Sequence, residues 1–330
     1  MTITVLKPGL QATVQDMGRF GYQKQGVVVG GAMDVSAARA ANVLVGNGEA
    51  EAVLELTWTG AQLRMEKEAI IAVCGADLMP EVDGEPVPMW RPVLVRAGAV
   101  LAFRGCRSGF RSYIALAGGI DLPPVMGSRS TYLRAGLGGY RGRMLQAGDK
   151  LEAKPFASGS LNGRLTAALL ERRAPGGWHA EHFAIAERET AVVRAFPGAH
   201  YGRLTEEGKR MLFGGSFRIG HQSDRMGCRL EGERVAIRQE GELLSEAVSA
   251  GTIQLPPNGS PIVLLADRQT TGGYPRIAHV ASVDIPMFAQ LKPGAEVRFE
   301  LITHREAESL LLASEKDFHM LRTAVALKFR

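Results

Sequence analysis

The sequence contains few cysteines, no long apolar run and no strong excess of either charge. Cys74, Cys106 and Cys228 are far apart and form no CxxC pair, which excludes a disulfide framework and a cysteine zinc site as interpretations of the pattern. No apolar run approaches the length of a membrane span, and the stretch before Lys7 is too short for a secretory signal, so we expect a cytoplasmic protein. The net charge of +5 is made without a long basic run, which disfavours nucleic acid as a partner.

Several cofactor and nucleophile motifs are absent as well. The chain has no GxxxxGK[ST] or GxGxxG phosphate cradle, and neither Ser223 nor Ser245 lies in a GxSxG elbow. The glycine-rich stretch 136–142 lacks a strand-to-helix context, so both a ligand contact and a flexible loop stay open for it. His179 and His182 have no carboxylate companions at metal-site spacing. We therefore predict no metal site at these two histidines.

The pattern of apolar residues predicts a mainly β protein with short helices. The 330 residues suffice for two domains, and most apolar segments before about Leu151 are short and end at glycine, which is typical of strands. Asp83-Gly84 predicts a tight hairpin turn. One helix is expected to begin at the N-cap Asp34 and to end at Gly46.

We predict two lobes joined by a segment rich in serine, glycine and proline. Residues 1–155 form the N-terminal β-rich lobe, 156–190 the junction, and 191–330 the C-terminal lobe. In the second lobe a short helix is capped by Thr205, and a long terminal helix begins at the capping box Thr303-x-x-Glu306. We interpret the apolar face of that helix as a packing face, with a partner groove as the alternative.

The most informative stretch is 262–275, where an apolar run ends in a dense polar cluster. Ile262 to Leu265 predict a buried strand, and Gly272-Gly273 predict the turn that follows the cluster. A core strand holds polar side chains rigidly at the surface, and glycines let backbone amides approach a ligand. The simpler interpretation is an ordinary strand end followed by turn residues.

Two further segments combine Asp, Arg, Gln and Gly in the same way. One spans 221–230 and the other 13–22. Three such segments suggest one site assembled from several loops, although each Asp-Arg neighbour can also be a surface ion pair worth only about 0–1 kcal/mol. The candidate catalytic residues are Asp224, Arg225, Asp267 and Arg268. The candidate substrate-binding residues are Gln15, Asp16, Arg19, Gln222, Ser223, Gln269, Thr270, Thr271, Gly272, Gly273 and Tyr274.

Many short blocks in order along the chain resemble the biotin-dependent carboxyltransferase-like family. That family includes the C component of 5-oxoprolinase and the second half of the urea carboxylase carboxyltransferase domain, also called allophanate hydrolase subunit 2. The blocks cover nearly the whole chain and thin out between about Lys154 and Val192. They are Pro8-Gly9-Leu10, Thr13 to Arg19, Gly31 to Asp34, Ala40 to Asn47, Gly75 to Leu78, Gly118 to Ile120, Gly127 to Thr131, Gln222 to Gly227 and Ala266 to Pro275.

The resemblance implies a fold of two cyclophilin-like β-barrel lobes and an activity that needs other chains. It implies ATP-dependent opening of 5-oxo-L-proline to L-glutamate, with Mg and ATP bound by a complex. The partners in that complex would be proteins like the A and B components of 5-oxoprolinase, the latter similar to allophanate hydrolase subunit 1.

Two alternatives follow from the same resemblance. One is half of a biotin-dependent carboxyltransferase acting on urea or a related amide. In that case biotin comes from another chain, because Ala32-Met33-Asp34 lacks the attachment lysine. The other is a regulatory binding protein that antagonises a kinase inhibitor.

Both enzymatic alternatives assign the polar segments comparable chemistry. Arg225 and Arg268 are suited to stabilise a carboxylate, phosphate or oxyanion. Asp16, Asp224 and Asp267 are suited to accept a proton or to bind Mg²⁺.

Overall fold

The computed structural model of the chain describes residues 2–58, 60–171, 179–180, 190–238 and 243–330. Its contacts divide the chain into two compact units, each made of separate stretches. The first unit comprises Met1–Arg19, Asp34–Ile185 and Asp317–Arg330, and the second comprises Phe20–Met33 and Ala186–Lys316. The sequence-based boundaries at 155 and 191 treat each lobe as a single stretch. Most of the predicted junction after residue 171, including His182, lies outside the described residues.

The first unit is built from two antiparallel sheets around one core. Within the described residues, the six-stranded sheet has the order β11-β1-β4-β9-β6-β7 and the five-stranded sheet the order β2-β3-β10-β5-β8. The strands of the first sheet are β11 (Lys150–Glu152), β1 (Thr2–Pro8), β4 (Ala61–Met65), β9 (Val100–Phe103), β6 (Pro80–Val82) and β7 (Glu85–Pro86). Those of the second are β2 (Gln11–Gln15), β3 (Val53–Thr57), β10 (Ser108–Leu116), β5 (Ala69–Asp77) and β8 (Pro92–Val95).

The core of this unit contains apolar side chains from both sheets. Ile3 and Leu63 come from the six-stranded sheet, and Leu54, Val73 and Ile114 from the five-stranded sheet. Because one face of each sheet is apolar, the two faces bury each other as in a sandwich. The sequence predicted barrels in both lobes, whereas the strands described in this unit form two sheets.

Helix α1 (Val35–Leu44) packs on β5 and β10 of the five-stranded sheet. As predicted, it begins at Asp34, whose carboxylate accepts the Ala37 amide at 2.8 Å. It ends before Gly46, which has a φ of 80° and takes up the left-handed conformation common after a helix. The predicted turn is also present, because Asp83 and Gly84 have positive φ and connect β6 to β7. Both local predictions are confirmed.

The predicted junction also contains a helix that its composition did not indicate. Helix α2 (Leu161–Leu170) begins at Ser160, whose hydroxyl accepts the Gly163 amide at 3.2 Å. Asn162 in its first turn donates to the Val45 carbonyl at 2.7 Å. A cap and a tertiary contact therefore stabilise a segment that the Ser/Gly/Pro pattern presented as a linker.

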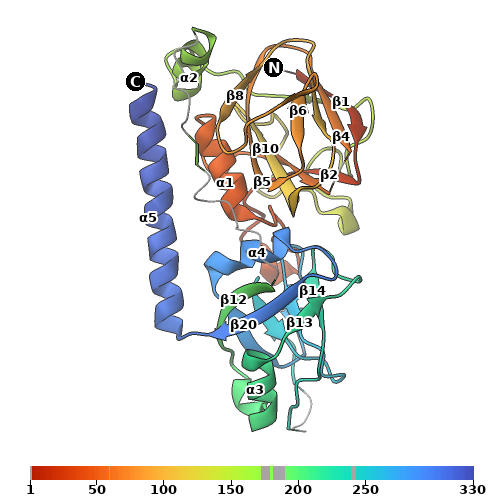
Figure 1. Cartoon of the computed structure of the whole chain (residues 1–330). Helices are drawn as coiled ribbons and strands as arrows, with labels where there is room; N and C mark the ends of the chain where they lie inside the picture. Colours follow the sequence, from red (N-terminus) through yellow and green to blue (C-terminus); the bar gives the residue numbers. More distant parts are fainter. Residues whose placement is uncertain (1, 59, 172–178, 181–189, 239–242) are drawn as a thin grey trace. The chain divides into compact units, whose positions relative to one another are not determined.

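The second unit contains a closed β barrel (Figure 1). In the described part of the chain its seven strands follow one another in the order β12-β19-β16-β17-β14-β13-β20, which confirms the predicted mainly β class and a barrel lobe. Only β12 and β20 pair in parallel among these described strands. The strands are β12 (Thr190–Pro197), β19 (Arg276–Val280), β16 (Thr252–Gln254), β17 (Ile262–Leu264), β14 (Gly227–Glu231), β13 (Phe217–Ile219) and β20 (Glu296–Leu301).

The barrel interior is apolar, with Val193, Ile253, Val263 and Phe299 fully buried or nearly so. Outside it lie the small pair β15 (Glu246–Ala247) and β18 (Thr271–Gly272) and the helices α3 (Glu206–Gly214) and α4 (Ile285–Gln290). Helix α3 begins at Thr205, as predicted, because the Thr205 hydroxyl accepts the Gly208 amide at 2.9 Å.

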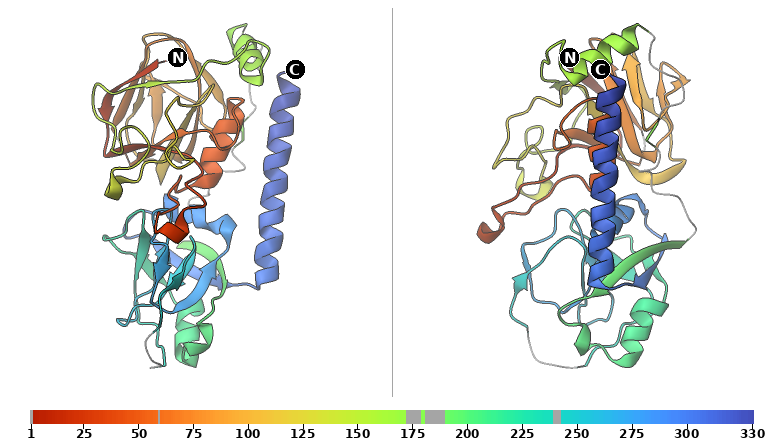
Figure 2. Two further views of the ribbon diagram at one scale, coloured as in Figure 1. Left: turned by 180° about the vertical axis from the view of Figure 1, so that it is seen from behind. Right: turned by 90° about the vertical axis from the view of Figure 1, so that its left-hand side faces the viewer.

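The long terminal helix, α5 (His304–Lys328), is continuous over 25 residues (Figure 2). The predicted capping box is present in both directions: the Thr303 amide donates to the Glu306 carboxylate at 2.7 Å, and the Glu306 amide donates to the Thr303 hydroxyl at 3.2 Å. Residues up to Lys316 belong to the second unit and those from Asp317 to the first. Among the described helices, none combines the length and apolarity needed to cross a membrane.

Candidate functional site

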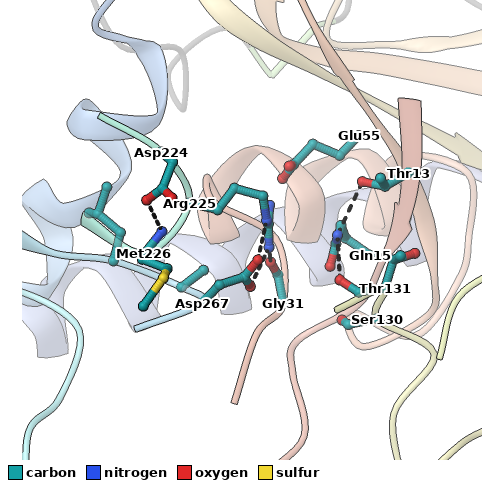
Figure 3. A network of polar contacts seen from close by, with 12 residues as sticks. Thr13, Gln15, Gly31, Glu55, Ser130, Thr131, Asp224, Arg225, Met226 and Asp267 are labelled. Atoms are coloured by element: carbon teal, nitrogen blue, oxygen red, sulfur yellow. Dashed lines mark hydrogen bonds and ion pairs between the residues drawn. The ribbon is translucent and has the colours of Figure 1, made fainter. Parts of the chain in front are cut away.

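The polar segment after β17 is organised by a buried ion pair between Arg225 and Asp267. The Asp267 carboxylate accepts from Arg225 Nε at 2.8 Å and from Nη2 at 3.0 Å, and both residues are almost fully buried. Nη2 also donates to the Gly31 carbonyl at 2.6 Å (Figure 3). The backbone closes the arrangement, since the Asp267 amide donates to the Arg225 carbonyl at 2.8 Å. Two of the segments singled out in the sequence are therefore joined directly.

This geometry makes the pair rigid and electrically compensated. Two parallel hydrogen bonds from one guanidinium to one carboxylate are the strongest form of such a pair. In a buried position each charge depends on the other, and removing one partner costs about 3–5 kcal/mol. Arg225 and Asp267 thus fix the start of the loop that carries the next residue, Arg268.

Arg268 is half-buried and has no carboxylate partner among the described residues. Its guanidinium donates to three backbone carbonyls, those of Leu265 at 3.2 Å, Val248 at 3.4 Å and Ala266 at 3.5 Å. Burial lowers the pKa of Arg268, and the nearby charge of Asp267 opposes that effect only in part. The acid next to it is already paired with Arg225. A cation held in place by long, neutral contacts is suited to receive an anion.

The orientation of Arg268 does not arise from the alternation of side chains along a strand, because the strand ends before this residue. Strand β17 ends at Leu264, and the chain is in a turn at Ala266 and Asp267. The Arg268 amide donates to the Leu265 carbonyl at 3.3 Å, so a local turn directs the side chain. The apolar run Ile262–Leu265 is one residue longer than the strand that it forms.

The residues that follow Arg268, from Gln269 to Tyr274, are half-buried or exposed. Gln269 donates to the buried Gln254 at 3.2 Å, while Thr271, Gly273 and Tyr274 are exposed. A side chain at Gly272 would meet the Gln254 amide at 2.4 Å. A larger residue there would displace the end of the Gln254 side chain. The Thr270 carbonyl accepts the Val248 amide at 3.1 Å.

In the segment 222–229, the polar side chains other than Arg225 shape the turn. The Asp224 carboxylate accepts the amides of Met226 at 2.8 Å and Gly227 at 3.3 Å, and the Ser223 hydroxyl accepts the Arg229 amide at 3.1 Å. Asp224 and Gln222 are exposed. Such side-chain to backbone bonds are a common way for aspartate and serine to stabilise a turn.

In the first unit, Asp16 binds a loop of its own unit. Its carboxylate accepts the Ser128 hydroxyl at 2.7 Å, the Ser130 hydroxyl at 2.5 Å and the Arg129 amide at 2.5 Å, and also the Gly18 amide at 2.9 Å. Four donors satisfy a carboxylate that is 6% exposed. The contacts of Asp16 are those of a residue that fastens one loop to another.

Arg19 has a comparable role, being fully buried within the same loops. Its Nε donates to the Val125 carbonyl at 2.9 Å and its Nη2 to the Ser130 carbonyl at 3.0 Å. A side chain at Gly138 would meet Arg19 Nη2 at 2.6 Å and the Ser130 carbonyl oxygen at 2.2 Å. The glycine-rich stretch 136–142 therefore packs closely on Arg19 and its partners.

Gln15 is fully buried beside this loop but is only partly satisfied. Its amide nitrogen donates to the Thr13 hydroxyl at 3.1 Å and to the Thr131 carbonyl at 3.2 Å (Figure 3). Its Oε1 has no partner among the described residues. Because Gln15, Asp16 and Arg19 belong to the first unit and the other candidates to the second, the assembly of all three segments into one site stays a prediction.

The sequence interpretation did not include a row of buried polar residues across β2, β3 and β10. Thr13, Glu55 and Tyr113 are direct neighbours in the register of these strands. The Tyr113 hydroxyl donates to Glu55 at 2.9 Å and accepts the Asp34 amide at 2.7 Å. Burial, followed by the charges of Glu55 and Asp34, raises the pKa of Tyr113 well above its usual value. The sequence offered one indication of this buried polar row, namely Glu55 between the apolar residues Leu54 and Leu56.

The residues present do not form a phosphate cradle of the glycine-loop kind. In 136–142 the Gly139 amide donates to the Arg129 carbonyl at 3.1 Å and the Gly142 amide to the Gly138 carbonyl at 2.8 Å. Those amides are not free to bind phosphate, which a phosphate loop requires. Within the described part of the chain, no three His, Cys, Asp or Glu side chains are grouped to hold a metal ion.

Comparisons with known proteins agree on the family. The model of the family described as "Carboxyltransferase domain, subdomain A and B" matches residues 25–301. The C component of the 5-oxoprolinase of Haemophilus influenzae is 34% identical over 98% of this chain and 98% of its own length. That of Escherichia coli K12 is 35% identical over 97% of both chains.

A solved structure shows the same fold within a much longer protein. The urea amidolyase of K. lactis superposes with a TM-score of 0.84 at 26% identity, over 97% of this chain. This chain spans 20% of that protein. The matched family model, the two relatives of nearly equal length and the shared fold lead to one conclusion: the chain belongs to the carboxyltransferase domain, subdomain A and B family.

Proposed function

We propose that this chain is the C component of a 5-oxoprolinase and takes part, with partner proteins, in the ATP-dependent opening of 5-oxo-L-proline to L-glutamate. Support for this reaction comes from the two 5-oxoprolinase components that match over nearly their full lengths. The observation in the molecule that carries the proposal is Arg268, a half-buried cation without a carboxylate partner among the described residues. The substrate and the product of this reaction both carry a carboxylate.

In this proposal, Arg268 binds the substrate carboxylate and its neighbours position it. A guanidinium can form two parallel hydrogen bonds to a carboxylate, which fixes the orientation of the ring that carries it. Arg225 and Asp267 neutralise each other, so we assign them the positioning of the Arg268 turn. Gln269 lies next to Arg268 and, held by Gln254, presents polar groups beside the same loop.

The activation of the lactam is assigned to the complex. An unactivated amide needs its oxygen phosphorylated or strongly polarised before water can attack it. Because the glycine-rich stretch 136–142 uses its amides internally, we place the ATP site on a partner protein. We accordingly expect the isolated chain to be inactive and to co-purify with a protein like the B component of 5-oxoprolinase, which carries the complementary part of the site.

The test is a conservative change at Arg268 in the reconstituted complex. Arg268→Lys keeps the charge but loses the two-pronged contact, which lysine cannot reproduce. We expect ATP-dependent release of glutamate from 5-oxo-L-proline to fall roughly ten- to a hundredfold, the effect of losing about 1.5–3 kcal/mol of charge-assisted binding. Arg218→Lys is the matched control, because Arg218 is an exposed arginine on β13. Equal turnover by the two variants would remove Arg268 from the site, and activity of the chain alone would contradict the need for partners.

A second function is supported by the likeness to urea amidolyase over 97% of this chain. In that case the chain is half of a carboxyltransferase that accepts a carboxyl group from biotin carried by another chain. The same complexes can decide between the two, because a carboxyltransferase would transfer labelled carboxyl from carboxybiotin to an amide without releasing glutamate.

A further inference from the structure

The second unit has a cavity on the outside of its barrel, separate from the Arg225–Asp267 pair. Three of its lining residues come from adjacent strands: Phe196 on β12, His279 on β19 and Thr252 on β16. They are direct neighbours in the strand register, and Ala247 and Ser249 also line the cavity. The volume is about 300 Å³, which suits a small ligand. The cavity is lined by Phe196, Pro197, Gly198, Ala199, Ala247, Ser249, Thr252, Arg276, Ala278 and His279.

One side of the cavity is rich in polar hydrogen-bonding groups. The hydroxyls of Ser249 and Thr252 lie 3.4 Å apart, and the Thr252 hydroxyl lies 3.4 Å from His279 Nδ1. These contacts are long, so the hydroxyls can turn toward a ligand without losing a strong bond. The lining also includes apolar side chains, and the Phe196 ring lies 5.3 Å from the His279 ring, centre to centre.

The residues that line the cavity include one cation, Arg276, and no acid. Arg276 forms an ion pair with Glu246, but its buried Nε has no hydrogen-bond partner among the described residues. A buried donor of this kind costs free energy until an acceptor reaches it.

The pKa of His279 is shifted by burial and by nearby positive charges. Burial lowers the pKa of His279 to about 4, and the charges of Arg268 and His304 contribute to the shift. His279 is therefore neutral at pH 7, and its ring is free to donate or accept a hydrogen bond. An anion bound beside it would offset the positive charges and raise that pKa.

We propose that this cavity binds a small organic carboxylate, with the carboxylate at Arg276, Thr252 and His279 and the apolar part of the ligand against Phe196. The volume admits one five-membered ring with a carboxyl group, the Ser249 and Thr252 hydroxyls supply donors for that group, and Arg276 supplies a positive charge in the lining. The site does not depend on the reaction proposed above. If that reaction is right, 5-oxo-L-proline is one acid of the required class.

The experiment is a binding titration on the full chain, followed by NMR of the histidine rings. Cyclopentanecarboxylate is the main probe, cyclopentanecarboxamide is its neutral counterpart, and inorganic phosphate and 5-oxo-L-proline are further arms. We expect the carboxylate to bind and to raise the His279 pKa, and the carboxamide to bind at least tenfold more weakly. Equal binding of acid and amide would overturn the proposal, and so would binding of phosphate alone with no shift at His279.

Two substitutions locate the binding site. Arg276→Gln should weaken the carboxylate at least tenfold, because a charge-assisted contact is lost. Thr252→Val keeps the side-chain volume and removes one hydroxyl, so we expect about fivefold weaker binding with an unchanged fold. Arg218→Gln removes an exposed cation of the same barrel that does not line the cavity, and should bind as wild type. Unchanged affinity in Thr252→Val, or an equal loss in Arg218→Gln, would place the ligand elsewhere.

The outcomes also separate this proposal from the proposed function. Binding of cyclopentanecarboxylate without any turnover of 5-oxo-L-proline by the complex would retain the cavity and reject the reaction. Turnover in a complex whose chain shows no carboxylate-dependent shift at His279 would reject the cavity and retain the reaction.

Discussion

The Asp16–Arg19 cluster of the first unit and the Asp267–Arg268 cluster of the second have the same residue types but different uses for them. In the first, the Asp16 carboxylate accepts four bonds from its own loops, and Arg19 donates to two carbonyls at 2.9 and 3.0 Å while fully buried. In the second, Asp267 is occupied by Arg225, and Arg268 holds only contacts of 3.2–3.5 Å. Segments of similar composition thus have different roles: Asp16 and Arg19 hold loops of the first unit together, whereas Arg268 of the second unit is suited to bind an anion. The length of the hydrogen bonds that hold each arginine distinguishes the two clusters.

The largest effect is expected from removing the acid of the second cluster. Asp267→Asn leaves the Arg225 charge buried without compensation, so the free energy of unfolding should fall by about 3–5 kcal/mol. Urea unfolding of the full chain measures this change. The double substitution Asp267→Asn with Arg225→Met removes both charges and should recover part of the loss. A single variant as stable as wild type would mean that the pair contributes nothing to the fold.

The next largest effect on stability is expected from changing the arginine of each cluster, Arg19 or Arg268, to lysine. Arg19→Lys loses two short bonds in a fully buried site and should reduce the free energy of unfolding by about 2–3 kcal/mol. Arg268→Lys loses only long contacts, so its unfolding free energy should change by less than about 1 kcal/mol. Thermal unfolding of both variants under identical conditions decides the point. Equal destabilisation would erase the distinction between the two clusters.

A smaller effect concerns the hydroxyl that helps to satisfy Asp16. Ser128→Ala removes a donor at 2.7 Å from a buried carboxylate, which should cost about 1–2 kcal/mol. Ser223→Ala is the counterpart in the second unit, where the hydroxyl only accepts an amide at 3.1 Å, and we expect a loss below about 1 kcal/mol. Unfolding measurements that reverse this order would contradict the assignment of the first cluster to structure.

The smallest effect on stability is expected at Gln222. Its side chain is exposed, so Gln222→Ala should change the unfolding free energy by no more than about 0.5 kcal/mol. Because Gln222 was selected from the sequence as a substrate contact, the informative measurement is turnover by the reconstituted complex. A stable variant with lost turnover would extend the second cluster to Gln222, and a fully active one would confine the site to the loop of Arg268.

Local features were predictable because short-range chemistry determines them. Asp34, Thr205 and the Thr303–Glu306 box start their helices where the sequence indicated, and Asp83-Gly84 forms its hairpin. The ion pair between Arg225 and Asp267 joins residues 42 positions apart, and nothing in either segment identifies the other as its partner. The two sheets of the first unit depend on which strands pair, which the strand pattern leaves open.

The candidate site shows the same limit. Asp16 and Asp267 lie in segments of similar composition, rich in Asp, Arg, Gln and Gly. Only the structure shows that Asp16 binds the loop 128–130 and that Asp267 pairs with Arg225. The sequence did not predict the contact between Glu55 and Tyr113. Each residue lies in a strand with a mainly apolar sequence, and their contact depends on the register of β3 and β10. Arg268 was selected because it follows the apolar run Ile262–Leu265, whereas a turn after Leu264, and not the strand, orients its side chain.

The end of α5 has a consequence for the order in which the chain can fold during synthesis. Phe318, Val325 and Phe329 are buried, Arg39 stacks 3.9 Å over the Phe318 ring, and Arg164 donates to the Phe329 carbonyl at 2.7 Å. These contacts all belong to the first unit, most of which precedes residue 186. As the chain leaves the ribosome, the first unit must therefore wait with an open apolar surface until the residues near 330 emerge. The second unit can close its barrel during that interval, so the part translated first is the part completed last.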